Sequence, residues 1–369
     1  MPSNSENQWI LELYRTWLSG PIKSITPMLP VGASILQELL SLPQVLKKSP
    51  EDASTLILLE TSTNPASGGS PTLGHVIRDL MHPLENDHNI FDFVNRYGDP
   101  DVEYPEFFIS MLRATEGHAW DDSRRLYGAL HIQSSKDGIG SCHIDAYPFS
   151  SEQNSLVDDA GWVSTWTPPA AISHTHMDYY GSMQYTVHFY GKKLWILWPP
   201  TPQNLRWFSL RHKKRADANL TLDCIRNLEG LQLNFLDDTE ARFVIKPNTL
   251  HACLSFGSSA HTAVRVWSYS HFDESYTIME WGLQWLRGLY ISRGQSRAEM
   301  IEEADTLKDE MEKWCSLAER NLKDPSTSRV RKDVKVLMDR LGEIRNQLNI
   351  PPPKPTQKKK MAKGMKRRT

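Results

Sequence analysis

The sequence predicts an α+β protein with a jelly-roll core, a mixed region before that core and helices after it. Between residues 160 and 272, aromatic and β-branched residues gather in short runs that turns separate. These runs cover residues 162–166, 183–190, 193–198, 231–235, 242–245, 251–256 and 262–269. Beyond residue 273, apolar residues recur at spacings of three and four, which is typical of helices with one buried face.

The N-terminal region, 1–159, mixes helix and strand signals. Ile10, Leu13, Tyr14 and Trp17 fall on one face of a helix that should end before residue 20. A second helix is expected around 34–42, and an apolar strand at 55–60. Residues 74–135 carry both kinds of signal and do not fix an order of elements. We expect region 1–159 to pack on the core.

The core, residues 160–272, is expected to be a double-stranded β-helix of the cupin type. Many short strands joined by turns favour two facing sheets, and the mouth between such sheets can hold a ligand. Any metal ion would bind in that mouth.

Residues 273–349 are expected to form a helical region. Apolar residues repeat at helical spacing over 297–323 and again over 330–348, with a break at Asp324-Pro325-Ser326. Two such helices joined by a short loop should form an antiparallel hairpin. The hairpin should pack on the core or on a second copy of the chain, which would make a homodimer.

The last segment, 350–369, differs from the rest in charge. It contains eight Lys and Arg and no acidic residue, whereas the region 1–349 carries 34 basic and 44 acidic side chains, a net charge of −10. With many prolines and few apolar residues, this segment is expected to be a disordered basic tail. It favours nuclear localisation and attraction to nucleic acid, and a merely solubilising end is the alternative.

Composition excludes several classes of protein. The four cysteines are scattered over the 369 residues without a CxxC pair, so neither a zinc module nor a disulfide framework is indicated. This pattern favours a reducing, intracellular setting. No apolar run is long enough to cross a bilayer and the N-terminus lacks a basic region, so we expect no membrane span and no signal peptide.

A His-x-Asp pair marks the candidate metal site. His176 and Asp178 precede the runs at 183–190 and 193–198, whose junction at 191–192 predicts a hairpin beside the metal. His251 opens a later strand after a turn and supplies a third ligand. Two histidines and one carboxylate on one side of an ion are typical of non-haem Fe(II), and a hydrolytic zinc site is the alternative.

A second His-x-Asp pair, His143 and Asp145, competes with the first. The residue seventeen positions beyond His143 is Ala160 rather than lysine, and the run at 146–155 is typical of a loop. The first pair is therefore preferred.

The motif around His176 resembles that of the JmjC oxygenases, over roughly residues 160–272. In that family a lysine after the His-x-Asp holds the far carboxylate of 2-oxoglutarate, and Lys193 lies seventeen positions beyond His176, as in the lysine demethylase branch. A small hydroxyl residue three before the first histidine corresponds to Ser173, and Thr186 stands where Tyr or Asn is common. Lys192 and Lys193 should point to opposite faces of their strand, so only one can reach the pocket.

The resemblance implies an Fe(II)- and 2-oxoglutarate-dependent dioxygenase. The leading interpretation is a nuclear enzyme that acts on a protein substrate and demethylates N-methyl lysine, with a histone tail as the expected partner. A protein hydroxylase would use the same site. A catalytically silent JmjC scaffold or binding module is the alternative of a different class, and the complete triad and Lys193 argue against it.

Overall fold

A computed structural model gives the structure of the chain. It describes residues 8–19, 28–42, 56–59, 71–81, 90–93, 97–98, 104–115, 126–134, 138–139, 142, 155–158, 161–178, 181–211, 219–237, 240–292, 297–320 and 325–347.

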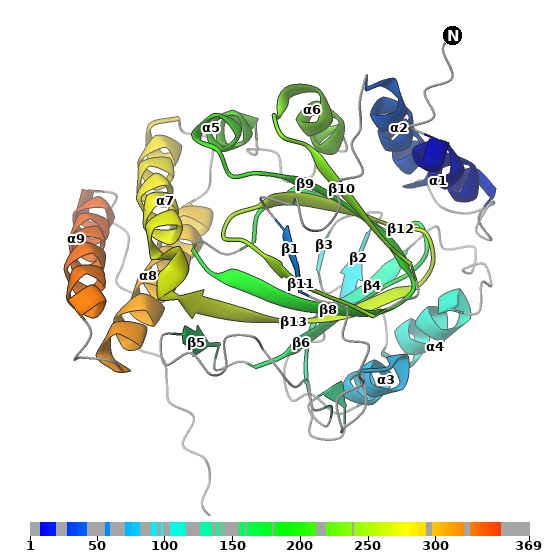
Figure 1. Ribbon diagram of the computed structural model, residues 1–369, viewed down its shortest axis with the longest axis horizontal. Coiled ribbons are helices and arrows are strands. Elements are labelled where there is room, and N and C mark those ends of the chain that lie inside the picture. The colour runs from blue at the N-terminus through cyan, green and yellow to red at the C-terminus, as the bar shows by residue number, and fades with distance from the viewer. Residues whose placement is uncertain are drawn as a thin grey trace, which may run out of the picture.

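Two antiparallel sheets form the centre of the molecule (Figure 1). The large sheet has the order β1-β11-β8-β13-β6-β4-β2-β3, and β5 pairs with β13. Its strands are β1 (Leu56–Leu59), β2 (Ile90–Asp92), β3 (Tyr97–Gly98), β4 (Tyr127–Gln133), β5 (Ser155–Val157), β6 (Val163–Thr167), β8 (Met183–Tyr190), β11 (Ala241–Ile245) and β13 (Ser259–Ser268). The small sheet has the order β10-β9-β12-β7. Its strands are β7 (Ile172–His176), β9 (Lys192–Trp198), β10 (Gln232–Asp237) and β12 (Leu250–Ser255).

The path of the chain between these sheets makes a double-stranded β-helix. From β6 to β13 the chain crosses repeatedly from one sheet to the other, and all the pairings are antiparallel. This confirms the predicted α+β class and its cupin-like jelly-roll core. The large sheet extends beyond residues 160–272, because β1, β2, β3 and β4 come from the N-terminal region.

The predicted hairpin at 191–192 is wrong. β8 pairs with β11 and β13 in the large sheet, whereas β9 pairs with β10 and β12 in the small one. The turn between them, Gly191, has a φ of +81°, and a Cβ there would lie 1.8 Å from the carbonyl oxygen of Ser258. Only glycine allows this close approach, so the chain turns a corner between sheets instead of pairing with itself.

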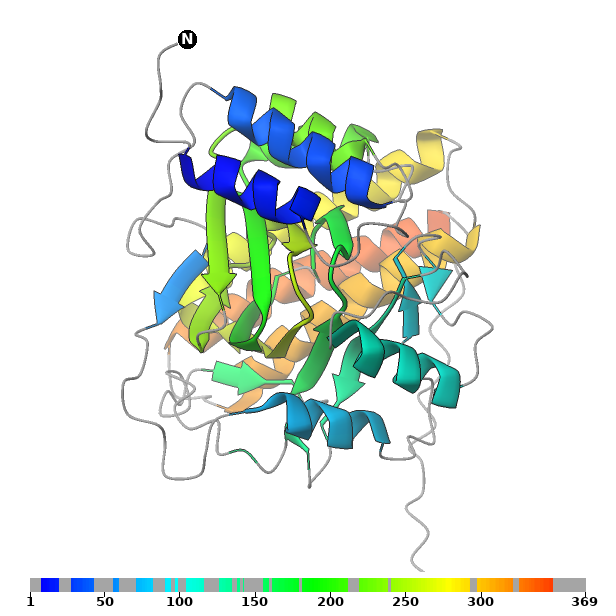
Figure 2. The ribbon, with the colours of Figure 1, turned by 90° about the vertical axis from the view of Figure 1, so that its right-hand side faces the viewer.

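Helices cover the outer face of the small sheet (Figure 2). Alternate residues of β9, among them Leu194 and Ile196, point outward and pack in one apolar cluster with residues of these helices such as Ile10 and Leu36. The intervening residues Trp195 and Leu197 point into the barrel, where they join Phe243 and Cys253. The helices on the side of the small sheet are α1 (Gln8–Ser19), α2 (Met28–Ser41), α5 (Pro202–Arg211) and α6 (Leu220–Asn227). Two others, α3 (Leu73–Met81) and α4 (Tyr104–Thr115), contact β4 of the large sheet.

The C-terminal region packs against one end of the jelly roll (Figure 1). Its helices are α7 (Phe272–Ser292), α8 (Arg297–Arg320) and α9 (Pro325–Gln347), preceded by a short 3-10 turn. Trp267 of β13 is fully buried among their apolar residues. An ion pair joins Asp305 near the start of α8 to Arg345 near the end of α9, so these two helices run antiparallel as predicted. α7 lies before this hairpin and completes its core.

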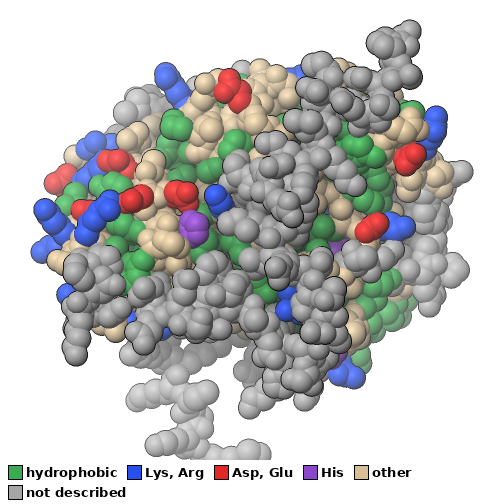
Figure 3. All heavy atoms as spheres, in the orientation of Figure 1, with side chains coloured by type: hydrophobic (Ala, Val, Ile, Leu, Met, Phe, Trp, Pro, Cys, Tyr) green, Lys and Arg blue, Asp and Glu red, His purple; other side chains and the backbone are tan. Residues whose placement is uncertain are grey.

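Charged side chains of both signs are mixed over the surface of the helical end (Figure 3). Several of them form ion pairs, among them Lys308 with Glu312, Arg329 with Asp273 and Arg340 with Glu280. In the part of the chain that the structure describes, no helix combines the length and apolarity needed to cross a membrane.

Candidate metal centre

The two histidines of the predicted triad lie on neighbouring strands of the small sheet. His176 is the last residue of β7 and pairs with His251 of β12, while Ser173 pairs with Cys253. Between these two pairs β7 has one residue more than β12, which is a β-bulge. The extra residue places His176 and Ser173 on the same face although they are three apart. That face is the barrel interior, because Cys253 belongs to the interior cluster.

Asp178 follows two residues after His176 and completes the cluster. Its Oδ1 lies 3.7 Å from Nε2 of His176, and its Oδ2 lies 3.6 Å from Nε2 of His251. One ligand atom from each residue lies within 4.8 Å of the other two. Atoms this close converge on one point that a single divalent ion can contact.

Backbone carbonyls orient both imidazole rings. Nδ1 of His176 donates to the carbonyl oxygen of His174 at 2.7 Å, and Nδ1 of His251 donates to that of Thr249 at 3.0 Å. A ring that donates from Nδ1 carries its lone pair on Nε2. Both Nε2 atoms are the ones that face Asp178, so the tautomers suit metal binding.

The protonation states also suit a cation. Burial and the nearby His251 lower the pKa of His176 to about 4, so its ring is neutral at pH 7. Burial alone would raise the pKa of Asp178, but His251 and His176 outweigh it and the pKa is lowered. A neutral imidazole and an ionised carboxylate are the forms that ligate metal.

Lys193 lies inside the barrel, on the wall that the small sheet forms. Its side chain is 2% exposed and its ammonium lies 5.5 Å from the ring centre of Trp195. No carboxylate of the described residues forms an ion pair with it, and burial lowers its pKa. Lys192 is exposed, so the predicted alternation leaves Lys193 as the lysine that reaches the interior. A buried ammonium without an anion is costly, which makes this position suited to an anionic ligand.

Thr186 lies in the opposite sheet and faces the barrel interior, because it pairs with Phe243 of the interior cluster. It is fully buried on β8, and its Oγ1 has no hydrogen-bond partner among the described residues. The same holds for Nδ1 of His261 on β13, whose ring lies 5.8 Å from that of Trp195. Ser173 lies on β7 at the same interior face. The interior therefore offers hydrogen-bonding groups on two walls beside one cation.

Two residues near the triad were not identified from the sequence. His131 lies at the register shift between β4 and β6 and has a φ of +55°, which is uncommon outside glycine. Burial lowers its pKa while the charge of Asp178 acts in the opposite direction. Arg265 of β13 also acts on the charge of Asp178. The sequence periodicity does not reveal His131, because neither a bulge nor a positive φ changes the apolar pattern. Arg265 reaches the segment after Asp178 through the register of β13.

The rival pair, His143 and Asp145, lies outside the described residues, as does the tail 350–369. Among the residues that are described, His176, Asp178 and His251 form the metal-competent group of three.

Comparisons with known proteins give a weak structural likeness. No family model matches the sequence, and no curated protein matches it. Two solved structures of YcfD, a ribosomal oxygenase from Escherichia coli, are similar to the chain. The first is 10% identical with a TM-score of 0.33, and the match covers 57% of this chain and 47% of that one. The second is 11% identical with a TM-score of 0.35, covering 58% and 50%. This chain thus matches about half the length of those proteins, and values this low assign it neither activity nor substrate.

Proposed function

We propose that the chain is an Fe(II)- and 2-oxoglutarate-dependent oxygenase of the JmjC type. The observation that carries the proposal is the pairing of two features in one barrel. A cluster of two histidines and one aspartate lies at the mouth. A buried lysine without a carboxylate partner among the described residues lies on the same interior face. A hydrolytic zinc site needs the first feature only, whereas a dicarboxylate cosubstrate needs both.

Different residues of the chain would bind the metal and the cosubstrate. His176 and His251 would hold the metal through Nε2, and Asp178 through its carboxylate. Lys193 would pair with the distal carboxylate of 2-oxoglutarate, since charge-assisted contacts are strongest where water is excluded. Thr186 and Ser173 would add hydroxyl contacts. When bound, Fe(II) with 2-oxoglutarate and dioxygen supplies the hydroxylation of a C–H bond, with release of succinate and carbon dioxide.

The substrate is proposed to be a protein, and the narrower reaction depends on where the hydroxyl group is placed. On an N-methyl carbon the product is a hemiaminal, which breaks down to formaldehyde and the amine. On an ordinary side-chain carbon it is a stable alcohol. Demethylation of N-methyl lysine, as in a histone tail, rests on the interval between His176 and Lys193, which matches the demethylase branch. Protein hydroxylation would use the same metal and cosubstrate residues and does not depend on that interval.

The experiment measures succinate formed from 2-oxoglutarate by the purified chain with Fe(II), alone and with peptide libraries. We expect turnover in the wild type and none in Asp178→Ala, with metal content measured in both. Peptide products that lose the mass of one methylene group and release formaldehyde indicate demethylation, and products that gain the mass of one oxygen atom indicate hydroxylation. A wild-type protein that binds Fe(II) but neither binds nor consumes 2-oxoglutarate would contradict the proposal and favour a scaffold.

A further inference from the structure

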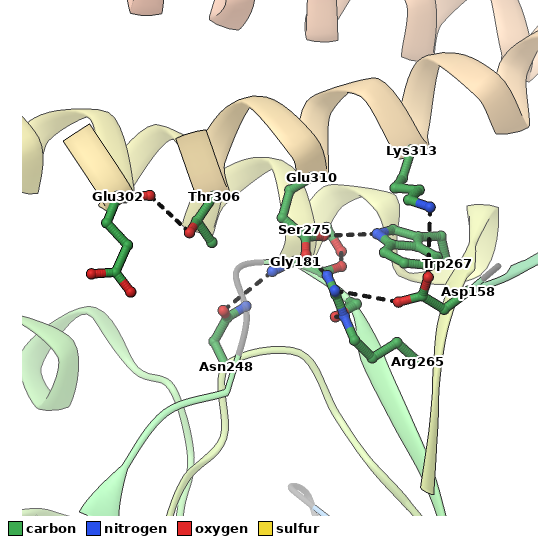
Figure 4. Close-up of polar contacts among 11 residues, drawn as sticks. Asp158, Gly181, Asn248, Arg265, Trp267, Ser275, Glu302, Thr306, Glu310 and Lys313 are labelled. Atoms are coloured by element: carbon green, nitrogen blue, oxygen red, sulfur yellow. Dashed lines mark hydrogen bonds and ion pairs between the residues drawn. The ribbon is translucent and has the colours of Figure 1, made fainter. Parts of the chain in front are cut away.

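A polar network joins the C-terminal helices to β13 and to the residues just before β8 (Figure 4). At its centre is Arg265 of β13, whose guanidinium forms an ion pair with Glu310 of α8. The same guanidinium lies 3.3 Å from Oδ2 of Asp158 and 4.9 Å from the ring centre of Trp267. Glu310 is fully buried and accepts a hydrogen bond of 2.8 Å from Nε1 of Trp267. The network thus clamps α8 onto the large sheet.

Arg265 also contacts the segment that carries the metal ligand Asp178. Its Nε donates to Oγ of Ser182 at 3.3 Å, and Ser182 lies four residues after Asp178. Ser182 is the residue immediately before β8. One guanidinium therefore links α8, through Glu310, to the segment between Asp178 and β8.

A second set of contacts holds the same segment beside the turn at residues 247–248, which precedes His251. The backbone N–H of Gly181 donates to Oδ1 of Asn248 at 3.3 Å, and Asn248 lies three residues before His251. The carbonyl of Gly181 accepts a hydrogen bond of 2.5 Å from the Ser275 hydroxyl of α7. Contacts from α7, from the turn before His251 and, through Arg265, from α8 therefore meet on Gly181 and Ser182, three and four residues after the metal ligand.

Stability alone gives little reason for a buried ion pair at this place. Taking two charges out of water costs about as much as their attraction returns, and apolar replacements of buried pairs are often as stable. Apolar packing around Trp267 already attaches the helices to the sheet. A guanidinium, in contrast, forms directional hydrogen bonds that fix the position of the acceptor. The acceptor of the Arg265 Nε is the Ser182 hydroxyl.

We propose that Glu310 and Arg265 are positioning residues for the metal site, through which the docked helix α8 holds Asp178 in place for metal binding. This inference rests on the proposed metal site and goes beyond it, because it makes metal affinity depend on a helix that contributes no ligand. Substitutions of groups that orient metal ligands typically weaken metal affinity by about 10- to 100-fold.

The test compares Glu310→Gln and Ser182→Ala with Asp305→Asn. The Asp305 variant loses an ion pair of α8 with Arg345 of α9, and this pair includes none of the residues that contact Arg265 in the network. Each full-length protein is titrated with Mn(II) under conditions in which the metal-free protein is folded, and its unfolding is measured without metal. We expect about tenfold weaker Mn(II) binding in the first two variants and wild-type affinity in Asp305→Asn. The double variant Glu310→Gln with Ser182→Ala should be no weaker than the worse single variant, because both remove the same link.

The outcomes separate this inference from the proposed function. If the wild type does not bind Mn(II), or binds it equally well as His251→Ala, the metal site itself fails. If the wild type binds through the triad but Glu310→Gln matches Asp305→Asn, only the positioning role fails. Should Glu310→Gln not fold, Ser182→Ala decides, because it leaves α8 clamped to Arg265, and unchanged affinity in that variant overturns the inference.

Discussion

Lys192 and Lys193 are neighbours in the chain but face different surroundings. Lys192 is exposed at the start of β9, whereas Lys193 is buried in the barrel beside Trp195. Alternation along a strand accounts for the difference, since successive side chains point to opposite faces. Burial lowers the pKa of Lys193, and a bound carboxylate would counteract that shift by stabilising the ammonium.

This pair of lysines gives a direct test of the cosubstrate. Lys193→Met should weaken 2-oxoglutarate binding and leave the metal in place, because it removes a charge-assisted contact and no ligand. The loss should be about 1.5–3 kcal/mol, or roughly 10- to more than 100-fold in Kd. Lys192→Met should have the affinity of the wild type. Titration of 2-oxoglutarate into both variants loaded with Mn(II) measures the difference, and equal effects would mean that neither lysine holds the cosubstrate.

The residues that could be identified from the sequence share a local signature. His176 and Asp178 are two apart, Lys193 follows a glycine turn and His251 follows another turn, so short-range patterns predict all four as candidates. Arg265 and His131 carry no such signature, and the sequence marks Asn248 only as part of the turn before His251. Strand register places Arg265, a β-bulge places His131, and a long-range loop contact places Asn248 against Gly181. These are consequences of the folded topology.

At the scale of elements, strands were easier to predict than their partners. The runs at 183–190 and 193–198 are the observed β8 and β9 within one residue, yet they belong to different sheets. A short interval between two apolar runs fits both a hairpin and a corner of a jelly roll. The corner forms because Gly191 approaches the backbone of Ser258 closely. Ser258 is far away in the chain, so no local sequence pattern contains that contact.

Glu303 of α8 is half-buried, and its carboxyl group has a consequence for stability. Burial raises the pKa of Glu303 to about 7, and its Oε1 has no hydrogen-bond partner among the described residues. Between about pH 4.5 and pH 7 the folded state keeps a proton that the unfolded state has lost. The free energy of unfolding therefore falls as pH rises through this window, and the whole loss is present above pH 7.

Glu303→Gln should remove that loss. The amide never ionises, so the variant should be about 2–3 kcal/mol more stable than the wild type at pH 8 and about equal to it at pH 4.5. Urea unfolding at both pH values measures the difference. Glu302→Gln is the matched control, because Glu302 is exposed on the same helix. A Glu303→Gln stability that follows the wild type at both pH values would show that the carboxyl group is solvated.

At the scale of the whole molecule, the C-terminal helices use their apolar stripes within the chain. Residues of the α9 repeat, Val330, Val334, Leu337, Leu341 and Ile344, are all buried in one cluster with α7 and α8. The same stripe is therefore not available as the seam of a dimer. A homodimer through these helices stays a prediction, and it would use an outward face such as that of α9, where Val336 is 46% exposed.

The net charge differs in sign between the two parts of the chain. The region 1–349 carries a net charge of −10 and the last segment carries eight positive charges. We propose that this tail serves nuclear localisation and attraction to nucleic acid, because an acidic body repels a polyanion and leaves the tail to bind it.

Deleting residues 351–369 should therefore abolish binding to duplex DNA and nuclear retention, while Mn(II) affinity and turnover on short peptides stay at the wild-type level. If the tail makes six to eight phosphate contacts, wild-type affinity should fall roughly 10³- to 10⁵-fold between about 50 and 200 mM salt. A full-length variant with the eight basic residues changed to Gln separates the effect of charge from that of length. Two results would contradict the proposal. Wild-type affinity that does not change with salt would do so, because counterion release makes binding weaken as salt rises. A truncated protein that still concentrates in the nucleus would also do so, because its retention would then not depend on the tail.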